Sequence, residues 1–70
     1  MSLVQENMKR IIDEKMLVQK GVAKRAGMSE QMFSAIMNGR KVIRADMIPC
    51  LAAALDVPIT ELFRNEKKGA

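Results

Sequence analysis

The sequence predicts an all-α fold, a compact bundle of five short helices in one small domain of 70 residues. Three observations support this prediction. Apolar residues recur at helical spacing along most of the chain. Cap residues and glycines divide the chain into helix-length segments. No stretch alternates apolar and polar residues in the manner of a half-buried strand.

The first helix is predicted to begin at Ser2. Ser2 and Gln5 have the spacing of a capping box, in which each side chain bonds the backbone of the other residue. The alternative is that the opening Met-Ser-Leu is a remnant of expression. An apolar stripe with a helical period follows, formed by Val4, Met8, Ile11 and Ile12.

Two further helices are predicted over residues 19–26 and 29–37, joined by a very tight turn. Gly27 is expected to end the earlier helix in a left-handed conformation. Ser29 is expected to cap the later helix at its N-terminus. Asn38 and Gly39 tolerate positive φ and are expected to end it.

The last two helices are predicted over residues 47–55 and around residues 59–63. Asp46 is expected to cap the fourth helix, with Pro49 tolerated in its first turn. Asp56, Val57 and Pro58 form the next break in the pattern.

The composition excludes several function classes. Zero His and one Cys leave no common metal-ligand set, no imidazole relay and no expected metal or cofactor, and no cofactor motif suggests an enzyme. Cys50 is expected to be a small core residue of a protein kept in a reducing cytoplasm. No apolar run is long enough for a membrane span, and no secretory leader is evident. A net charge of +4 is compatible with a polyanionic partner.

Residues 19–39, QKGVAKRAGMSEQMFSAIMNG, resemble the helix-turn-helix of the phage repressor and Cro family, also called the XRE family. The resemblance extends to residues 11–19 and to the ending LAAALDVPITELF at 51–63. Relatives often carry a buried Arg–Glu ion pair where this chain has Ile12 and Met37. We expect an apolar contact to replace that pair, which need not destabilise the fold.

The resemblance implies a lambda-repressor-like DNA-binding domain over residues 1–66, followed by a disordered tail over residues 67–70. It implies a transcriptional regulator, a repressor that binds a palindromic operator in double-stranded DNA as a homodimer. Such a protein would be cytoplasmic, bacterial or phage-encoded, and associated with the nucleoid. The alternative is a protein-interaction module of the same fold, such as an antirepressor or antitoxin, with weak or no DNA binding.

The resemblance also implies roles for individual residues. Bases would be read by Glu30, Gln31, Ser34 and Ala35. Phosphates would be contacted by Gln19, Ser29, Met32, Asn38, Gly39, Arg40, Lys41 and Arg44. Each role has a structural alternative: Glu30 as a favourable charge in a first helical turn, Met32 as a packing residue, Gln19 as a polar helix start, and the basic residues as solvated charges.

A dimer interface is predicted near the C-terminal end, formed by Val57, Ile59, Leu62 and Phe63. The alternative is that these side chains close the core of the monomer. The basic residues Lys20, Lys24 and Arg25 are expected to be mainly solubilising. Gly21, inside the second helix, has no physical explanation in the sequence.

Overall fold

A computed structural model describes residues 2–65 of the chain. Its elements are α1 (Leu3–Lys15), α2 (Gln19–Arg25), α3 (Glu30–Met37), the 3₁₀ turn η1 (Ala45–Met47), α4 (Ile48–Leu55) and the 3₁₀ turn η2 (Ile59–Phe63). The predicted all-α class is confirmed, since no strand occurs within residues 2–65. The tail expected at residues 67–70 lies outside the described residues.

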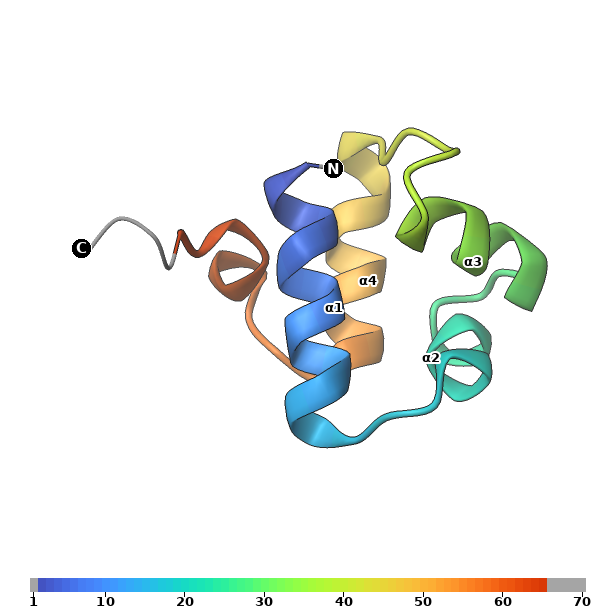
Figure 1. Ribbon diagram of the computed structural model, residues 1–70, viewed down its shortest axis with the longest axis horizontal. Coiled ribbons are helices and arrows are strands. Elements are labelled where there is room, and N and C mark those ends of the chain that lie inside the picture. The colour runs from blue at the N-terminus through green and yellow to red at the C-terminus, as the bar shows by residue number, and fades with distance from the viewer. Residues whose placement is uncertain (1, 66–70) are drawn as a thin grey trace.

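The α-helices are arranged around α1 and α4, which lie next to each other in the middle of the molecule (Figure 1). The pair α2 and α3 lies on one side of them, and η2 lies on the other side. The core between these elements contains Met8, Ile11, Ile12, Val22, Ala23, Phe33, Ile36, Met37, Leu51, Ala52, Ala54, Leu55 and Leu62. Ile12 and Met37 both belong to this core, as expected for an apolar replacement of the relatives' ion pair.

The four α-helices of the described residues all end in the same hydrogen-bond pattern, with a left-handed residue just beyond the helix. After α2, the amide of Gly27 donates to Lys24 O at 3.1 Å and that of Met28 to Ala23 O at 3.0 Å. These two bonds satisfy carbonyls that the helix leaves unpaired. The left-handed residue is a glycine after α2 and α3 but Met16 after α1 and Asp56 after α4.

Two of the predicted N-terminal caps are confirmed. Ser2 Oγ accepts from the Gln5 amide at 3.2 Å, and Gln5 Oε1 accepts from the Ser2 amide at 2.8 Å. Ser29 Oγ accepts from the Met32 amide at 3.1 Å. Each bond satisfies a donor that the first helical turn leaves free.

The structure corrects three details of the predicted elements. The fifth helix is the 3₁₀ turn η2, because a segment this short cannot sustain a longer helical ladder. Asp46 does not cap α4; it lies within η1, and α4 begins at Ile48 with Pro49 in its first turn. The second helix ends at Arg25, one residue earlier than predicted.

Cys50 was predicted to be a core residue, and this prediction is wrong: the side chain is exposed. The reason is its position on α4, whose buried residues are Leu51, Ala52, Ala54 and Leu55. A helix that buries these positions turns residue 50 towards solvent, whatever its side-chain type.

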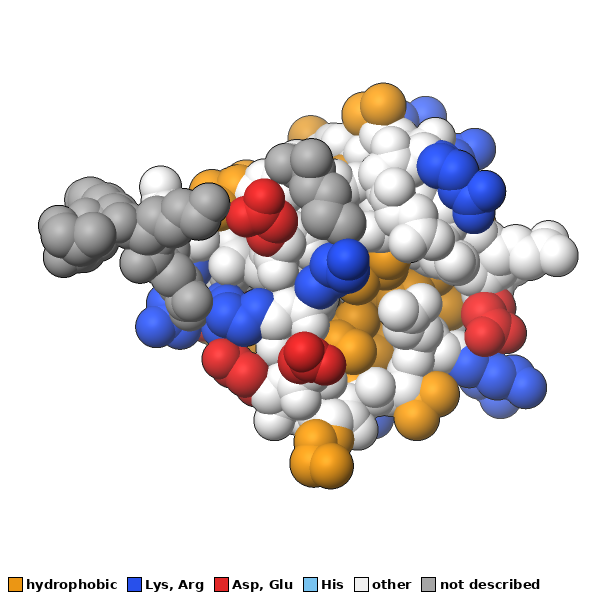
Figure 2. Space-filling model, in the orientation of Figure 1, with side chains coloured by type: hydrophobic (Ala, Val, Ile, Leu, Met, Phe, Trp, Pro, Cys, Tyr) orange, Lys and Arg blue, Asp and Glu red, His pale blue; other side chains and the backbone are white. Residues whose placement is uncertain are grey.

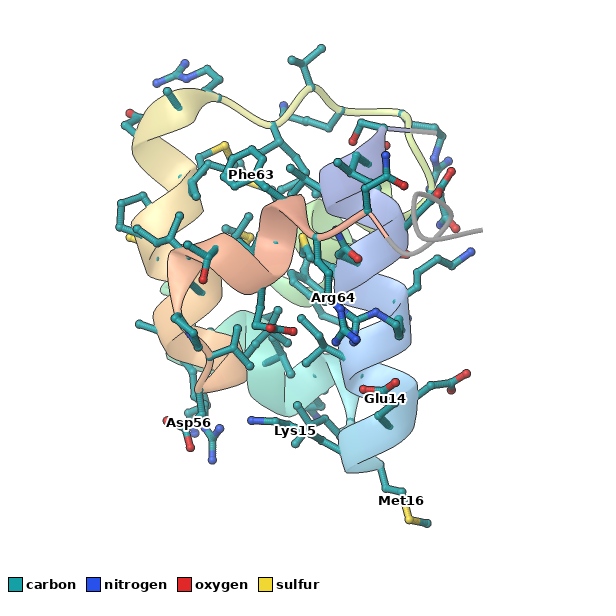
Figure 3. All side chains as sticks on the ribbon, turned by 90° about the vertical axis from the view of Figure 1, so that its left-hand side faces the viewer. Glu14, Lys15, Met16, Asp56, Phe63 and Arg64 are labelled. Carbon is teal, nitrogen blue, oxygen red and sulfur yellow. The ribbon has the colours of Figure 1, made fainter. Side chains whose placement is uncertain are left out.

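Basic side chains close the C-terminal end of α4 from two directions. Lys15 Nζ donates to Leu55 O at 3.0 Å and to Asp56 O at 2.9 Å. Figure 3 shows this side chain reaching from the end of α1 towards Asp56. Arg25 Nη1, at the end of α2, donates to Ala54 O at 3.3 Å. Cations at a helix C-terminus also interact favourably with its dipole, so Arg25 has a structural role beyond solubility.

Candidate nucleic-acid interface

The helix-turn-helix formed by α2 and α3 is held by core side chains and by its turn. Val22 and Ala23 of α2 and Phe33 and Ile36 of α3 are all buried. Gly27, at φ 76°, allows the chain to reverse between the two helices within a few residues. The outer face of α3 is therefore presented on a rigid support.

The far end of α3 is also fixed in place. Gln5 is buried on α1, and its Nε2 donates to Ile36 O at 2.7 Å. The amide of Gly39 donates to the same carbonyl at 3.1 Å. The side chain that caps α1 thus also ties the C-terminal end of α3 to α1.

The residues predicted to read bases lie together on the outer face of α3. Glu30 and Gln31 are exposed, while Ser34 and Ala35 are half-buried. A shallow hollow of about 300 Å³ is lined by Glu30, Gln31, Ser34 and Arg40. The structure therefore brings three of the four predicted residues into one concave surface.

The sequence did not predict that Arg40 would line this hollow. It was predicted to contact phosphate from the loop after α3, yet it lines the same hollow as Glu30. A guanidinium here lowers the cost of placing the Glu30 carboxylate near polyanionic DNA. No local sequence signal gives this proximity, because it depends on how residues 38–41 fold back at the end of α3.

Of the predicted phosphate-contacting residues, Arg40 lines this hollow and the others lie outside it. Most of them are exposed: Gln19, Ser29, Asn38, Gly39, Arg40, Lys41 and Arg44. Met32 is half-buried and packs against the core, in agreement with its structural alternative. Asn38 Nδ2 donates to Ser34 Oγ at 3.3 Å, which links the end of α3 to its outer face.

Two of the basic loop residues, Arg44 and Lys41, also lie next to groups that do not belong to this hollow. Arg44 Nη2 lies 3.3 Å from Asp46 Oδ2, in an exposed ion pair. Such pairs contribute little stability, so a phosphate can compete with Asp46 for this guanidinium. Lys41 lines a separate cleft of about 520 Å³, whose other walls include Val42, Ile48 and Phe63.

The charge pattern of this side of the molecule is mixed. Figure 2 shows basic side chains along the right-hand edge, over the loop after α3 and over α2, with an acidic side chain between them. The basic residues of these two segments are Lys20, Lys24, Arg25, Arg40, Lys41 and Arg44. The arrangement offers positive charge on both sides of the exposed face of α3.

The predicted dimer residues divide into two groups. Leu62 is fully buried, so its assignment to an interface is wrong; it fills the core of the monomer instead. Ile59 and Phe63 have 43% and 51% of their surfaces exposed, and Val57 is half-buried against the core. Only Ile59 and Phe63 of this set present substantial apolar surface to a second molecule.

Fold and surface together define a helix-turn-helix protein of the DNA-binding type. The second helix of the motif is α3, and its outer face is open to solvent. The sequence matches the helix-turn-helix family over residues 8–62, which is more than half of the chain. The chain belongs to this family, that of Cro and the phage repressors, whose members are DNA-binding regulators. No curated protein and no solved structure matches the chain significantly.

Within residues 2–65, no helix is long and apolar enough to cross a membrane. No three side chains of the His, Cys, Asp or Glu types gather there as potential metal ligands.

Proposed function

We propose that this protein is a sequence-specific regulator that represses transcription by binding a palindromic operator as a homodimer. The observation that carries the proposal is the hollow on α3, which joins exposed base-reading side chains to the basic loop that follows. In bacteria or phage-infected cells such a protein acts in the cytoplasm, on DNA of the nucleoid. One recognition helix spans too few base pairs for useful selectivity, which is why two copies are needed.

Base recognition is assigned to the outer face of α3 in the major groove. Gln31 can bond adenine N6 and N7, and Glu30 can accept from cytosine N4. Ala35 can pack on a thymine methyl, and Ser34 can bond several bases. Each good contact contributes roughly 1–3 kcal/mol of discrimination between bases.

Phosphate contacts are assigned to the basic loop after α3, to the start of α2 and to the two ends of α3. They include Arg40, Lys41 and Arg44 from the loop, Gln19 from the start of α2, and the turn at Asn38 and Gly39. Ser29 and Met32 lie at the start of α3, where backbone and side chain can approach the same strand. These contacts orient α3 but carry no sequence information.

The decisive experiment selects the preferred duplex from a random pool at near-physiological salt and then follows its affinity against salt concentration. We expect a palindrome with half-sites about 34 Å apart and a steep negative salt slope. If no duplex is enriched and the remaining binding ignores sequence, the proposal is wrong. The protein-interaction alternative would then be preferred.

Two variants separate phosphate contacts from base reading. Arg40→Gln together with Lys41→Gln should weaken binding to all duplexes about equally and reduce the salt slope by about 2. Gln31→Ala should change the preferred bases while leaving the salt slope unchanged. Lys9→Gln on α1 is the control, since it removes an exposed charge outside the helix-turn-helix. Equal behaviour of all three variants would contradict the assigned roles.

A further inference from the structure

A second hollow, of about 490 Å³, lies beside the turn between α2 and α3 and has an unusual sulfur content. Its walls include the side chains of Met28, Met32, Met47 and Cys50. Cys50 is the only cysteine of the chain, and three of its seven methionines line this one hollow. Of these four residues, only Met32 is also among those proposed to contact DNA.

The four residues come from both sides of the hollow. Met28 follows the turn glycine, and Met32 lies in the first turns of α3. Met47 precedes α4 and Cys50 comes three residues later, so both lie on the same face of that segment. The three methionines are half-buried and pack against the edge of the core, while Cys50 is exposed. Three thioether side chains and one thiol side chain thus line the same space, which is open to solvent.

Thiolate and thioether sulfurs are soft ligands, which select Cu⁺ over the hard cations bound by carboxylate and carbonyl oxygen. The hollow is also lined by Asp46, whose carboxylate lies 3.3 Å from Arg44 Nη2 in an exposed ion pair. The preference for Cu⁺ therefore rests on the soft character of the sulfur ligands and not on charge.

We propose that this hollow binds one Cu⁺ ion through Cys50 Sγ and thioether sulfurs of Met28, Met32 and Met47. On binding, the Cys50 thiol loses its proton to solvent and a sulfur–copper bond forms, with no change in oxidation state. Met47 Sδ accepts a hydrogen bond from the Arg44 amide at 3.4 Å. Thioether sulfur is a weak acceptor, so this bond opposes ligation little. Methionine side chains have several rotatable bonds and can converge on an ion without backbone movement.

A bound ion would connect the start of α3 to α4, since its ligands come from both. The regulatory part of the inference rests on the proposed DNA binding: Cu⁺ would change the affinity of α3 for its operator. The metal site itself does not depend on that function, because it is assayed without DNA.

The test is an anaerobic titration of the whole chain with Cu⁺ supplied as its bicinchoninate complex, whose colour reports transfer of the ion. We expect one ion per chain. Cys50→Ser and the double variant Met28→Leu with Met32→Leu should each weaken binding roughly 10- to 100-fold, the range in which changes around metal sites act. Met→Leu keeps the side-chain volume, and a thermal melt verifies the fold. Met16→Leu is the matched control, since Met16 is 87% exposed at the end of α1 and does not line the hollow.

An unchanged affinity of the double methionine variant would overturn the proposal, because a bare thiol would then account for the binding. One ion per two chains would also overturn it, since Cys50 would be bridging separate molecules. Operator affinity is then measured with and without Cu⁺. A protein that binds Cu⁺ but no DNA refutes the proposed function alone, and one that binds DNA but no Cu⁺ refutes the metal site alone.

Discussion

Two glycines of the helix-turn-helix differ in backbone conformation, which predicts opposite effects of the same substitution. A methyl group added at Gly21 or at Gly27 would meet no atom within 4 Å, so space does not distinguish them. Gly21 lies inside α2, where Ala is favoured over Gly by about 1 kcal/mol. Gly27 has φ 76°, where a Cβ costs roughly 1–2 kcal/mol. Urea denaturation should show Gly21→Ala more stable than the parent and Gly27→Ala less stable; a shift of the same sign in both would contradict this reasoning.

The pair Ile12 and Met37 gives a second prediction about single residues. Both side chains are buried in the core, at the two positions where the resemblance implies an ion pair in other members. Met37→Glu alone should lower the free energy of unfolding by about 3 kcal/mol or more, because a carboxylate would be buried without a partner. Adding Ile12→Arg should recover at least about 1 kcal/mol of the summed losses if the two positions can pair. Thermal melts of the four proteins form the cycle, and strict additivity would show that the positions do not interact.

At the scale of elements, a buried amide bonds α1 to η2, in addition to the core contacts of Leu62 and the ion pair between Arg10 and Glu61. Asn7 Nδ2 donates to Leu62 O at 2.8 Å and to Arg64 O at 2.7 Å. Asn7→Leu removes this donor and should cost about 1–3 kcal/mol of stability. Amide exchange in η2 should accelerate more than exchange in α2. The control is Lys9→Ala on the exposed face of α1, which should change stability by no more than about 0.5 kcal/mol. Equal exchange rates in the parent and Asn7→Leu would remove Asn7 as the anchor of η2.

The elements also show which features a sequence can predict. The caps at Ser2 and Ser29 and the turns at Gly27 and Gly39 are local, since every bonded group lies within a few residues. Their residue types therefore suffice to predict them. The bonds from Lys15 and Arg25 to α4 join residues far apart in sequence, so they exist only once the helices pack.

The same distinction applies to the candidate interface and to the wrong predictions. Glu30, Gln31 and Ser34 could be grouped from helical spacing alone, whereas the place of Arg40 in their hollow could not. Cys50 and Leu62 were misplaced because residue type does not determine which face of a short segment is covered. Rotation of α4 and η2 against their neighbours decides that.

At the scale of the whole molecule, the proposed dimer can be tested at Phe63. This side chain is half exposed at the end of η2 and lies beside the first turn of α4 (Figure 3). It lines the apolar cleft that also contains Val42 and Ile48. Since about half of it already contacts water, a lysine there should leave the monomer folded. A charge at a self-association surface is strongly disfavoured, because burying it unpaired costs several kcal/mol.

Phe63→Lys should therefore sediment as a monomer and lose cooperative binding to the selected palindrome, while its affinity for an isolated half-site persists. The matched control is Met16→Lys, which adds the same charge at an exposed apolar residue at the end of α1. Both variants gain one positive charge, so the comparison controls for the change in net charge. If Phe63→Lys still binds the palindrome cooperatively, η2 is not the surface that joins two copies, and the exposed apolar residues of the loop before α4 become the next surface to test.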